Sequence, residues 1–167
     1  INTTLAGNWE GALGTYFGKE AYSGGVATTQ YAHKNTGEKE TYYIPENLKK
    51  VTLTGSMYYG AFSMIKSLEE VNLGDNAKKI SDYALTGCSS HTRTKTGDGV
   101  KEIGRYAFYY CTSLKDVTLG SSITSIGGWA FGYCGAIAKI NYTGDITSWC
   151  AIGWLAGLMT ECVEGYS

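Results

Sequence analysis

Apolar and small residues in the middle of the chain recur every 23 positions. The repeating mark is an alanine followed by a bulky apolar residue, seen at Ala61–Phe62, Ala84–Leu85, Ala107–Phe108 and Ala130–Phe131. Three residues after each pair the chain has, in order, Ile65, Cys88, Cys111 and Cys134. The spacing holds without insertion or deletion from residue 61 to residue 134. A fixed period of this length is typical of a solenoid, in which each unit buries its apolar face against its neighbours.

A second apolar pattern precedes each of these pairs and alternates with polar residues. It has the form L-x-x-V-x-L, in the triplets Leu48, Val51, Leu53; Leu68, Val71, Leu73; Leu114, Val117, Leu119; and Ile137, Ile140, Tyr142. Alternation with a period of two predicts short strands that send every second side chain into the core. The i, i+1, i+4 spacing of Ala, Phe and Cys predicts one helical turn. We therefore expect an α/β repeat solenoid, a stack of short parallel strands joined by helical or 3₁₀ turns, over residues 48–142 in about four units.

Residues 1–47 predict an N-terminal cap made of a helix and a hairpin. The helix is indicated by a stripe of apolar residues after a capping asparagine, at Asn8, Trp9, Leu13, Tyr16 and Phe17. Two strand-like runs, Gln30–His33 and Thr41–Ile44, flank a polar turn and predict the hairpin. A cap is expected because the first unit of a solenoid would otherwise expose apolar surface.

Residues 143–167 predict either a C-terminal cap or the start of a further segment. An amphipathic stretch from Ile146 to Met159 carries the apolar residues Trp149, Cys150, Trp154, Leu155 and Leu158. We expect this stretch to fold over the last unit.

One unit departs from the apolar pattern. His91, Thr94 and Thr96 stand where the other units have leucine, valine and leucine. Unpaired polar groups facing a core cost about 1–3 kcal/mol each. Either this strand bends outward, or its hydroxyls bond to neighbouring backbone groups; in both cases it is the weakest unit.

The five cysteines divide into three that follow the period and two that do not. Stacked thiols of neighbouring units lie within reach of a disulfide, but buried free thiols, which pack as small hydrophobes, are the favoured interpretation. Pairing between Cys150 and Cys162 stays open.

Charge and composition exclude several classes of function. A net charge of −1 with 17% charged residues offers no basic surface for a nucleic acid. No apolar run reaches the ~20 residues of a membrane span. Two distant histidines and period-spaced cysteines form no metal-ligand cluster, and no phosphate-binding loop is present, so no cofactor is expected. The pair Cys88 and His91 resembles a nucleophile and its base, but both fall on core columns, so we do not expect an enzyme.

Two columns of outward-facing residues follow the predicted strands. The first alternates in charge, through Lys50, Glu70, Arg93, Asp116 and Lys139; the second is polar, through Thr52, Asn72, Lys95, Thr118 and Asn141. Opposite charges on adjacent strands contribute about 0.2–1 kcal/mol per pair, so the first column can serve to hold the strands in register. Both columns together are also the candidate ligand-binding face.

The unit from Leu114 to Cys134, in which L-x-x-V-x-L is followed by Ile-Gly-x-x-Ala-Phe-x-x-Cys, resembles the BspA-like leucine-rich repeat family. The resemblance covers residues 48–142 and implies a bacterial cell-surface protein of the type found in gut Firmicutes. It implies an extracellular location and no shared catalytic residue. For some members of the family, adhesion to host proteins is known.

Three functions are compatible with these features. The first is a non-catalytic, extracellular adhesion module that presents its sheet face to a protein partner, such as host extracellular matrix or another surface protein. The alternatives are a passive spacer in a larger surface protein and a carbohydrate-binding accessory module that uses Trp149 and Trp154. A rival binding surface is formed by tyrosines that either are exposed or pack between units: Tyr58, Tyr59, Tyr109, Tyr110 and Tyr133.

Overall fold

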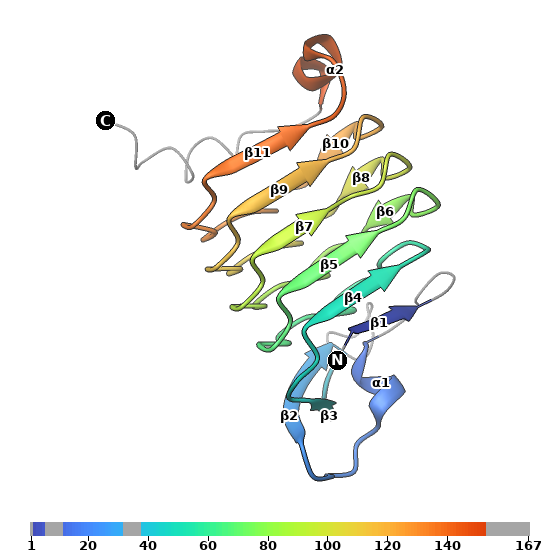
Figure 1. The fold of residues 1–167 in the computed structure, drawn as a ribbon, viewed down its shortest axis with the longest axis vertical. Coiled ribbons are helices and arrows are strands. Elements are labelled where there is room, and N and C mark those ends of the chain that lie inside the picture. The colour runs from blue at the N-terminus through green and yellow to red at the C-terminus, as the bar shows by residue number, and fades with distance from the viewer. Residues whose placement is uncertain (1, 6–11, 32–37, 153–167) are drawn as a thin grey trace.

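The chain forms a parallel β-solenoid, shown by a computed structural model that describes residues 2–5, 12–31 and 38–152 (Figure 1). The main sheet has six parallel strands in the order β1 (Asn2–Leu5), β4 (Lys50–Leu53), β5 (Glu70–Leu73), β7 (Arg93–Lys95), β9 (Asp116–Leu119) and β11 (Lys139–Tyr142). A second parallel sheet consists of β6 (Lys79–Ile80), β8 (Glu102–Ile103) and β10 (Ser125–Ile126). The predicted stack of short parallel strands is confirmed.

The strands of the main sheet bury alternate side chains, as the pattern predicts. In β4, Val51 and Leu53 are fully buried, whereas Lys50 and Thr52 lie partly exposed on the other face. The recurring alanines and the bulky apolar residues that follow them are all buried in the core. Backbone hydrogen bonds join one unit to the next at these positions, from Phe62 N to Ala84 O at 2.8 Å and from Phe108 N to Ala130 O at 2.7 Å. Equivalent residues of successive units therefore lie one above another.

Of the two predicted kinds of turn, the segment from Ala to Cys in each unit has the i to i−3 hydrogen bonds of the 3₁₀ type and is not α-helical. Hydrogen bonds from residue i to residue i−3 close the segment, as from Cys88 N to Leu85 O at 3.2 Å. Other amides of the segment donate to carbonyl groups of the next unit and not to carbonyl groups within the segment. This arrangement needs left-handed backbone at two positions per unit. Glycine, which tolerates positive φ, occupies only Gly60 and Gly87; bulky residues take the same conformation at Met64, Tyr83, Tyr106, Tyr110, Trp129 and Tyr133.

The N-terminal strand adds a turn that the period does not reveal. β1 pairs with β4 in parallel, and Leu13 N donates to Ala61 O at 2.6 Å, so Ala12 and Leu13 take the place of an Ala-Phe pair. Ala12 and Ala61 are 49 residues apart because a hairpin is inserted between them. The predicted helix is reduced to the four-residue α1 (Gly14–Phe17), while Asn8 and Trp9 lie outside the described residues.

The hairpin itself is confirmed and is longer than predicted. β2 (Gly25–Tyr31) pairs antiparallel with β3 (Lys39–Pro45), whereas its turn, with His33, falls outside the described residues. The buried Gln30 fixes the hairpin to the solenoid: its Oε1 accepts from Gly14 N at 2.8 Å and its Nε2 donates to Ser63 O at 2.8 Å.

At the other end, α2 (Ile146–Ala151) follows β11 (Figure 1). Asp145 caps it by accepting a hydrogen bond from Ser148 N at 2.7 Å. Trp149 is partly buried and Ile152 fully buried against the core. The remaining residues of the expected amphipathic stretch lie outside the described part of the chain: Trp154, Leu155, Leu158 and Met159. Within the described residues, no helix has the length and hydrophobicity to span a membrane.

Candidate functional site

The outer face of the main sheet carries both predicted columns, and we call it the sheet face. The strands are in the register that the repeat predicts, so that Lys50 lies opposite Glu70, Arg93 opposite Asp116, and each column runs straight across the sheet. The polar column is aligned in the same way: Thr52, Asn72, Lys95, Thr118 and Asn141.

Ion pairs and hydrogen bonds link the charged column across the strands. Lys50 Nζ lies 2.8 Å from Glu70 Oε1, and an Arg93 guanidinium nitrogen lies 3.7 Å from Asp116 Oδ2. Hydrogen bonds from Lys50 and Asn72 lower the pKa of Glu70, although partial burial opposes them. The Arg93 and Asp116 side chains remain 63% and 49% exposed, so their pair contributes at most about 1 kcal/mol and both stay accessible to a partner.

The sheet face is hollowed over a volume of about 670 Å³. Nine of the ten predicted residues line this hollow, all except Lys50: Thr52, Glu70, Asn72, Arg93, Lys95, Asp116, Thr118, Lys139 and Asn141. The prediction missed Leu73, Gly74, Asp75 and Gly97, which also line it. These four residues lie at the ends of strands or in the bends that follow, where alternation no longer indicates which way a side chain points.

Glycines are stacked at the strand ends, and two of them, Gly74 and Gly97, line one border of the hollow. Gly74, Gly97 and Gly120 are spaced by the period of 23 residues. A Cβ on Gly97 would lie 2.6 Å from the backbone of Gly74, and one on Gly120 would lie 2.4 Å from Gly97 O. Neighbouring backbones therefore approach too closely for any side chain. The recurrence of glycine at this spacing was the signal in the sequence that could have indicated this border.

Comparison with known proteins decides the family. Residues 27–151 match the BspA type leucine rich repeat region, in six copies. The chain belongs to the BspA-type leucine-rich repeat family. Among solved structures, it is similar to a leucine-rich repeat protein of T. pallidum, with a TM-score of 0.54 and 22% identity over 75% of this chain and 65% of that one.

A second similar structure is a leucine-rich cell surface protein of Faecalibacterium prausnitzii, with a TM-score of 0.52 and 20% identity over 74% of this chain. The chain spans 65% of the T. pallidum protein and 40% of the F. prausnitzii protein. At these identities the likeness shows the fold alone. No curated protein matches the chain.

The divergent unit of this BspA-type solenoid keeps its strand in register between β5 and β9, and its threonine hydroxyls bond to neighbouring backbone. Thr94 Oγ1 donates to Val71 O at 3.4 Å, and Thr96 Oγ1 accepts from Gly120 N at 2.8 Å. Of the two predicted arrangements, bonding to neighbouring backbone is confirmed. His91 differs, because it is fully buried and neither ring nitrogen has a hydrogen-bond partner. Desolvation lowers its pKa from 6.5 to about 4, against a smaller opposing effect of Glu70.

The period-spaced cysteines form the predicted ladder of buried free thiols. Each thiol donates to a backbone carbonyl of the preceding unit, as from Cys88 Sγ to Phe62 O at 3.0 Å. Burial raises the pKa of Cys88 to about 12, and neither ring nitrogen of His91 bonds to the thiol, so the two side chains are not arranged as a nucleophile and base. Cys150 is free and exposed, and Cys162 lies outside the described residues. Among the described residues, no three potential metal ligands cluster.

Aromatic residues stack along the turns of the BspA-type units. Tyr83 and Tyr106 stack at 5.1 Å between ring centroids, and Tyr110 and Tyr133 at 4.7 Å. Of the five tyrosines expected as a rival surface, only Tyr110 and Tyr133 are exposed, at 48% and 51%. Most of this aromatic surface is therefore occupied by packing between units.

Proposed function

We propose that this chain is a non-catalytic binding module of a cell-surface protein that presents its sheet face to a protein partner. The observation that carries the proposal is the hollow on the sheet face, whose lining alternates in charge and is held rigid by parallel strands. Outward residues of a solenoid can vary without disturbing its core, so such a face suits selective binding.

The centre of the sheet face carries accessible charges. Arg93 and Lys95 lie on β7 and are exposed, and Asp116 on β9 is about half exposed. Charges of both signs at fixed spacing favour a partner with the complementary arrangement and speed its association. The partner class that we propose is a protein of the host extracellular matrix or of another cell surface.

An extracellular location is part of the proposal. It is supported by membership of the BspA-type family and by the similar F. prausnitzii structure, which is a cell surface protein. A passive spacer would carry the same polar columns but bind nothing. The carbohydrate alternative has less support, since Trp149 packs partly buried against the core and Tyr142, with ring centroids 5.2 Å apart.

The test measures binding of the chain to a panel of immobilised extracellular-matrix proteins. Arg93→Glu and Asp116→Lys each reverse one charge and are expected to weaken binding about tenfold or more, whereas Lys101→Glu, an equal change at an exposed site near the second sheet, is expected to leave it unchanged. The exchange Arg93→Asp with Asp116→Arg keeps an internal ion pair and so separates loss of binding from loss of stability. Absence of binding by the wild type across the panel, or equal loss with Lys101→Glu, contradicts the proposal and favours the spacer.

A further inference from the structure

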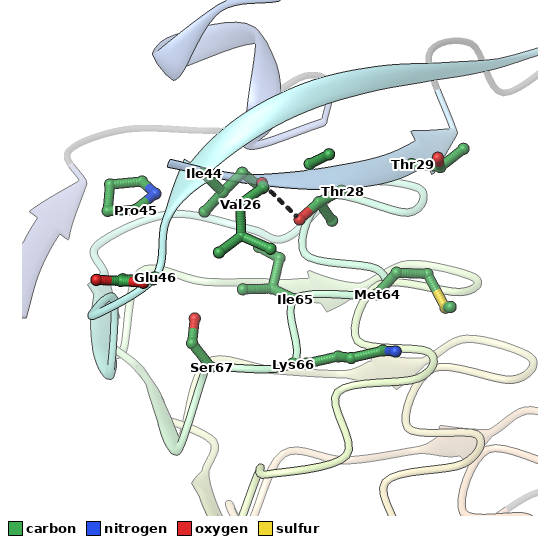
Figure 2. Close-up of a pocket in the computed structure, with 11 residues that line it drawn as sticks. Val26, Thr28, Thr29, Ile44, Pro45, Glu46, Met64, Ile65, Lys66 and Ser67 are labelled. Carbon is green, nitrogen blue, oxygen red and sulfur yellow. Dashed lines mark hydrogen bonds between the residues drawn. The ribbon is translucent and has the colours of Figure 1, made fainter. Parts of the chain in front are cut away.

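A groove separate from the sheet face lies between the hairpin and the next turn of the solenoid (Figure 2). It has a volume of about 460 Å³ and is lined by residues 26–29, 44–46 and 64–67. Figure 2 shows the side chains of Val26 and Ile65 close together in its middle, with Glu46 to one side and Lys66 extending toward the other.

The groove leaves apolar side chains incompletely covered. Val26 is 49% exposed and Met64 43% exposed, although the neighbouring Ile44 and Ile65 are fully buried in the core. Val26 lies on the same face of β2 as the buried Thr28 and Gln30, so it points toward the solenoid and not away from it. An apolar side chain of a partner would complete the packing around Val26.

Within the described part of the chain, no strand pairs with the edge of β2 that faces away from β3 and lies beside this groove. The N–H of Tyr43, on β3, points away from β2 and donates to Gly18 O. The N–H of Glu46, just after β3, points across the hairpin and donates to Gly24 O. Hydrogen-bonded and non-hydrogen-bonded pairs alternate in an antiparallel ladder, so the pair Ala27–Tyr43 is a non-bonded one. The N–H and C=O groups of Ala27 and of Thr29 therefore point away from β3, and no described residue bonds to them.

These free groups lie along the groove. The side chains of Ala27 and Thr29 lie on the exposed outer face of the hairpin, yet both residues line the groove. Their main chain is therefore the part that faces the groove. Gln30 fixes the strand to both Gly14 and Ser63, so the edge is held in place before any partner arrives. Preorganisation of this kind reduces the entropy lost on binding.

We propose that this groove binds an extended peptide segment of another protein, which adds to the hairpin as a third strand beside β2. The segment exchanges hydrogen bonds with the main chain of Ala27 and Thr29, two residues apart as in any β-ladder, and inserts one apolar side chain beside Val26 and Ile65. Main-chain bonds of this type supply affinity, and the pocket for the apolar side chain supplies selectivity. Glu46 and Lys66, both exposed, favour a segment with a basic residue toward one end and an acidic residue toward the other.

The probes are capped, fluorescently labelled pentapeptides of threonine whose central residue is valine, leucine or phenylalanine, titrated into the whole chain. Saturable binding is expected for at least one of them, with shifts of the Ala27 and Thr29 amide resonances. A peptide N-methylated at its bonding amides is expected to bind at least about tenfold more weakly.

Two variants test the geometry. Ala27→Pro removes an outward N–H without breaking a bond of the hairpin, and Val26→Lys places a charge in the groove; each is expected to abolish binding. If Ala27→Pro fails to fold, Val26→Lys decides alone. Lys95→Glu, on the sheet face, is the control and is expected to bind the peptides normally, which separates this proposal from the function proposed above. No saturable binding, equal binding of the N-methylated peptide, or a wild-type dimer that Ala27→Pro dissociates would overturn the proposal.

Discussion

Replacing His91 with leucine is expected to stabilise the protein by about 1–3 kcal/mol at neutral pH. The imidazole is fully buried in a column that has Leu68 and Leu114 in the units on either side, and both of its nitrogens lack partners. Burying a polar group without a hydrogen bond costs about 1–3 kcal/mol in proteins, and leucine removes that cost while filling a site already shaped for it. Since about 2–4 °C of melting temperature corresponds to 1 kcal/mol in a chain of this size, the change is measurable.

The same substitution is expected to flatten the dependence of stability on acid. His91 has a pKa of about 4 in the folded protein, against 6.5 as its ordinary value, because burial disfavours the charged ring. Between these two pH values the unfolded chain binds a proton that the folded chain rejects, so the free energy of unfolding falls as pH drops from about 6.5 to about 4. The difference between the two pKa values corresponds to a loss of about 3 kcal/mol.

The assay is urea unfolding of the wild type and His91→Leu at a series of pH values from 7 down to about 4. Both proteins retain His33, so the difference between their curves isolates His91. Leu114→His, which places the same ring at the equivalent site of the next unit, serves as the matched control and is expected to steepen the loss in acid. Parallel curves for the wild type and His91→Leu, or a less stable variant at pH 7, would refute the reasoning.

Three further changes test other parts of the structure. Gly97→Ala is expected to destabilise the fold by more than about 2 kcal/mol, because the added Cβ would lie 2.6 Å from the backbone of Gly74. Gly128→Ala, where a Cβ would meet no atom within 4 Å, is the control and is expected to change the stability by no more than about 0.5 kcal/mol, as compared by thermal melts. Gln30→Leu removes the hydrogen bonds that hold the hairpin and is expected to cost about 2 kcal/mol, with faster hydrogen exchange confined to β2 and β3. Alkylation of the native protein, read by mass spectrometry, is expected at Cys150, with no modification before unfolding at the buried thiols Cys88, Cys111 and Cys134.

The sequence predicted those parts of the fold that depend on repetition. A period without insertions determines which strands are neighbours and which residues face each other, so the register of β5, β7, β9 and β11 followed from the 23-residue spacing alone. β4 pairs with β5 at an offset of 20 residues, and there the recurring L-x-x-V-x-L pattern indicated the register. The turn containing β1 was missed because its Ala12–Leu13 pair is separated from Ala61 by the inserted hairpin. Periodicity carries no signal across an insertion.

The backbone of the turns could not be predicted from residue type. Spacing of i, i+1 and i+4 fits a helix, and Tyr106 or Trp129 are residues that rarely adopt positive φ. The conformation is imposed by the next unit, whose carbonyls accept the amides of the turn. Interactions between units therefore outweigh local preference at these positions.

The two candidate surfaces also differ in whether the sequence could predict them. The sheet face was predictable because alternation within a strand and register between strands assign each outward residue its place. The groove beside β2 was not, because it depends on where the hairpin rests against residues 64–67. The hydrogen bonds of the buried Gln30 to Gly14 and Ser63 help to fix that position, and no pattern of hydrophobic residues reveals them.

The divergent unit connects stability to the proposed function. It supplies Arg93 and Lys95 to the centre of the sheet face and also contains His91, whose two ring nitrogens are buried without hydrogen-bond partners. Local opening of the divergent unit would remove β7 from the sheet. A partner that contacts Arg93 and Lys95 as proposed therefore binds the unit only when β7 is in the sheet. By mass action its binding must protect the amides of β7 from exchange more than those of β4. In acid, where opening lets His91 take up a proton, the same coupling must weaken binding, although no charge on the sheet face has to change.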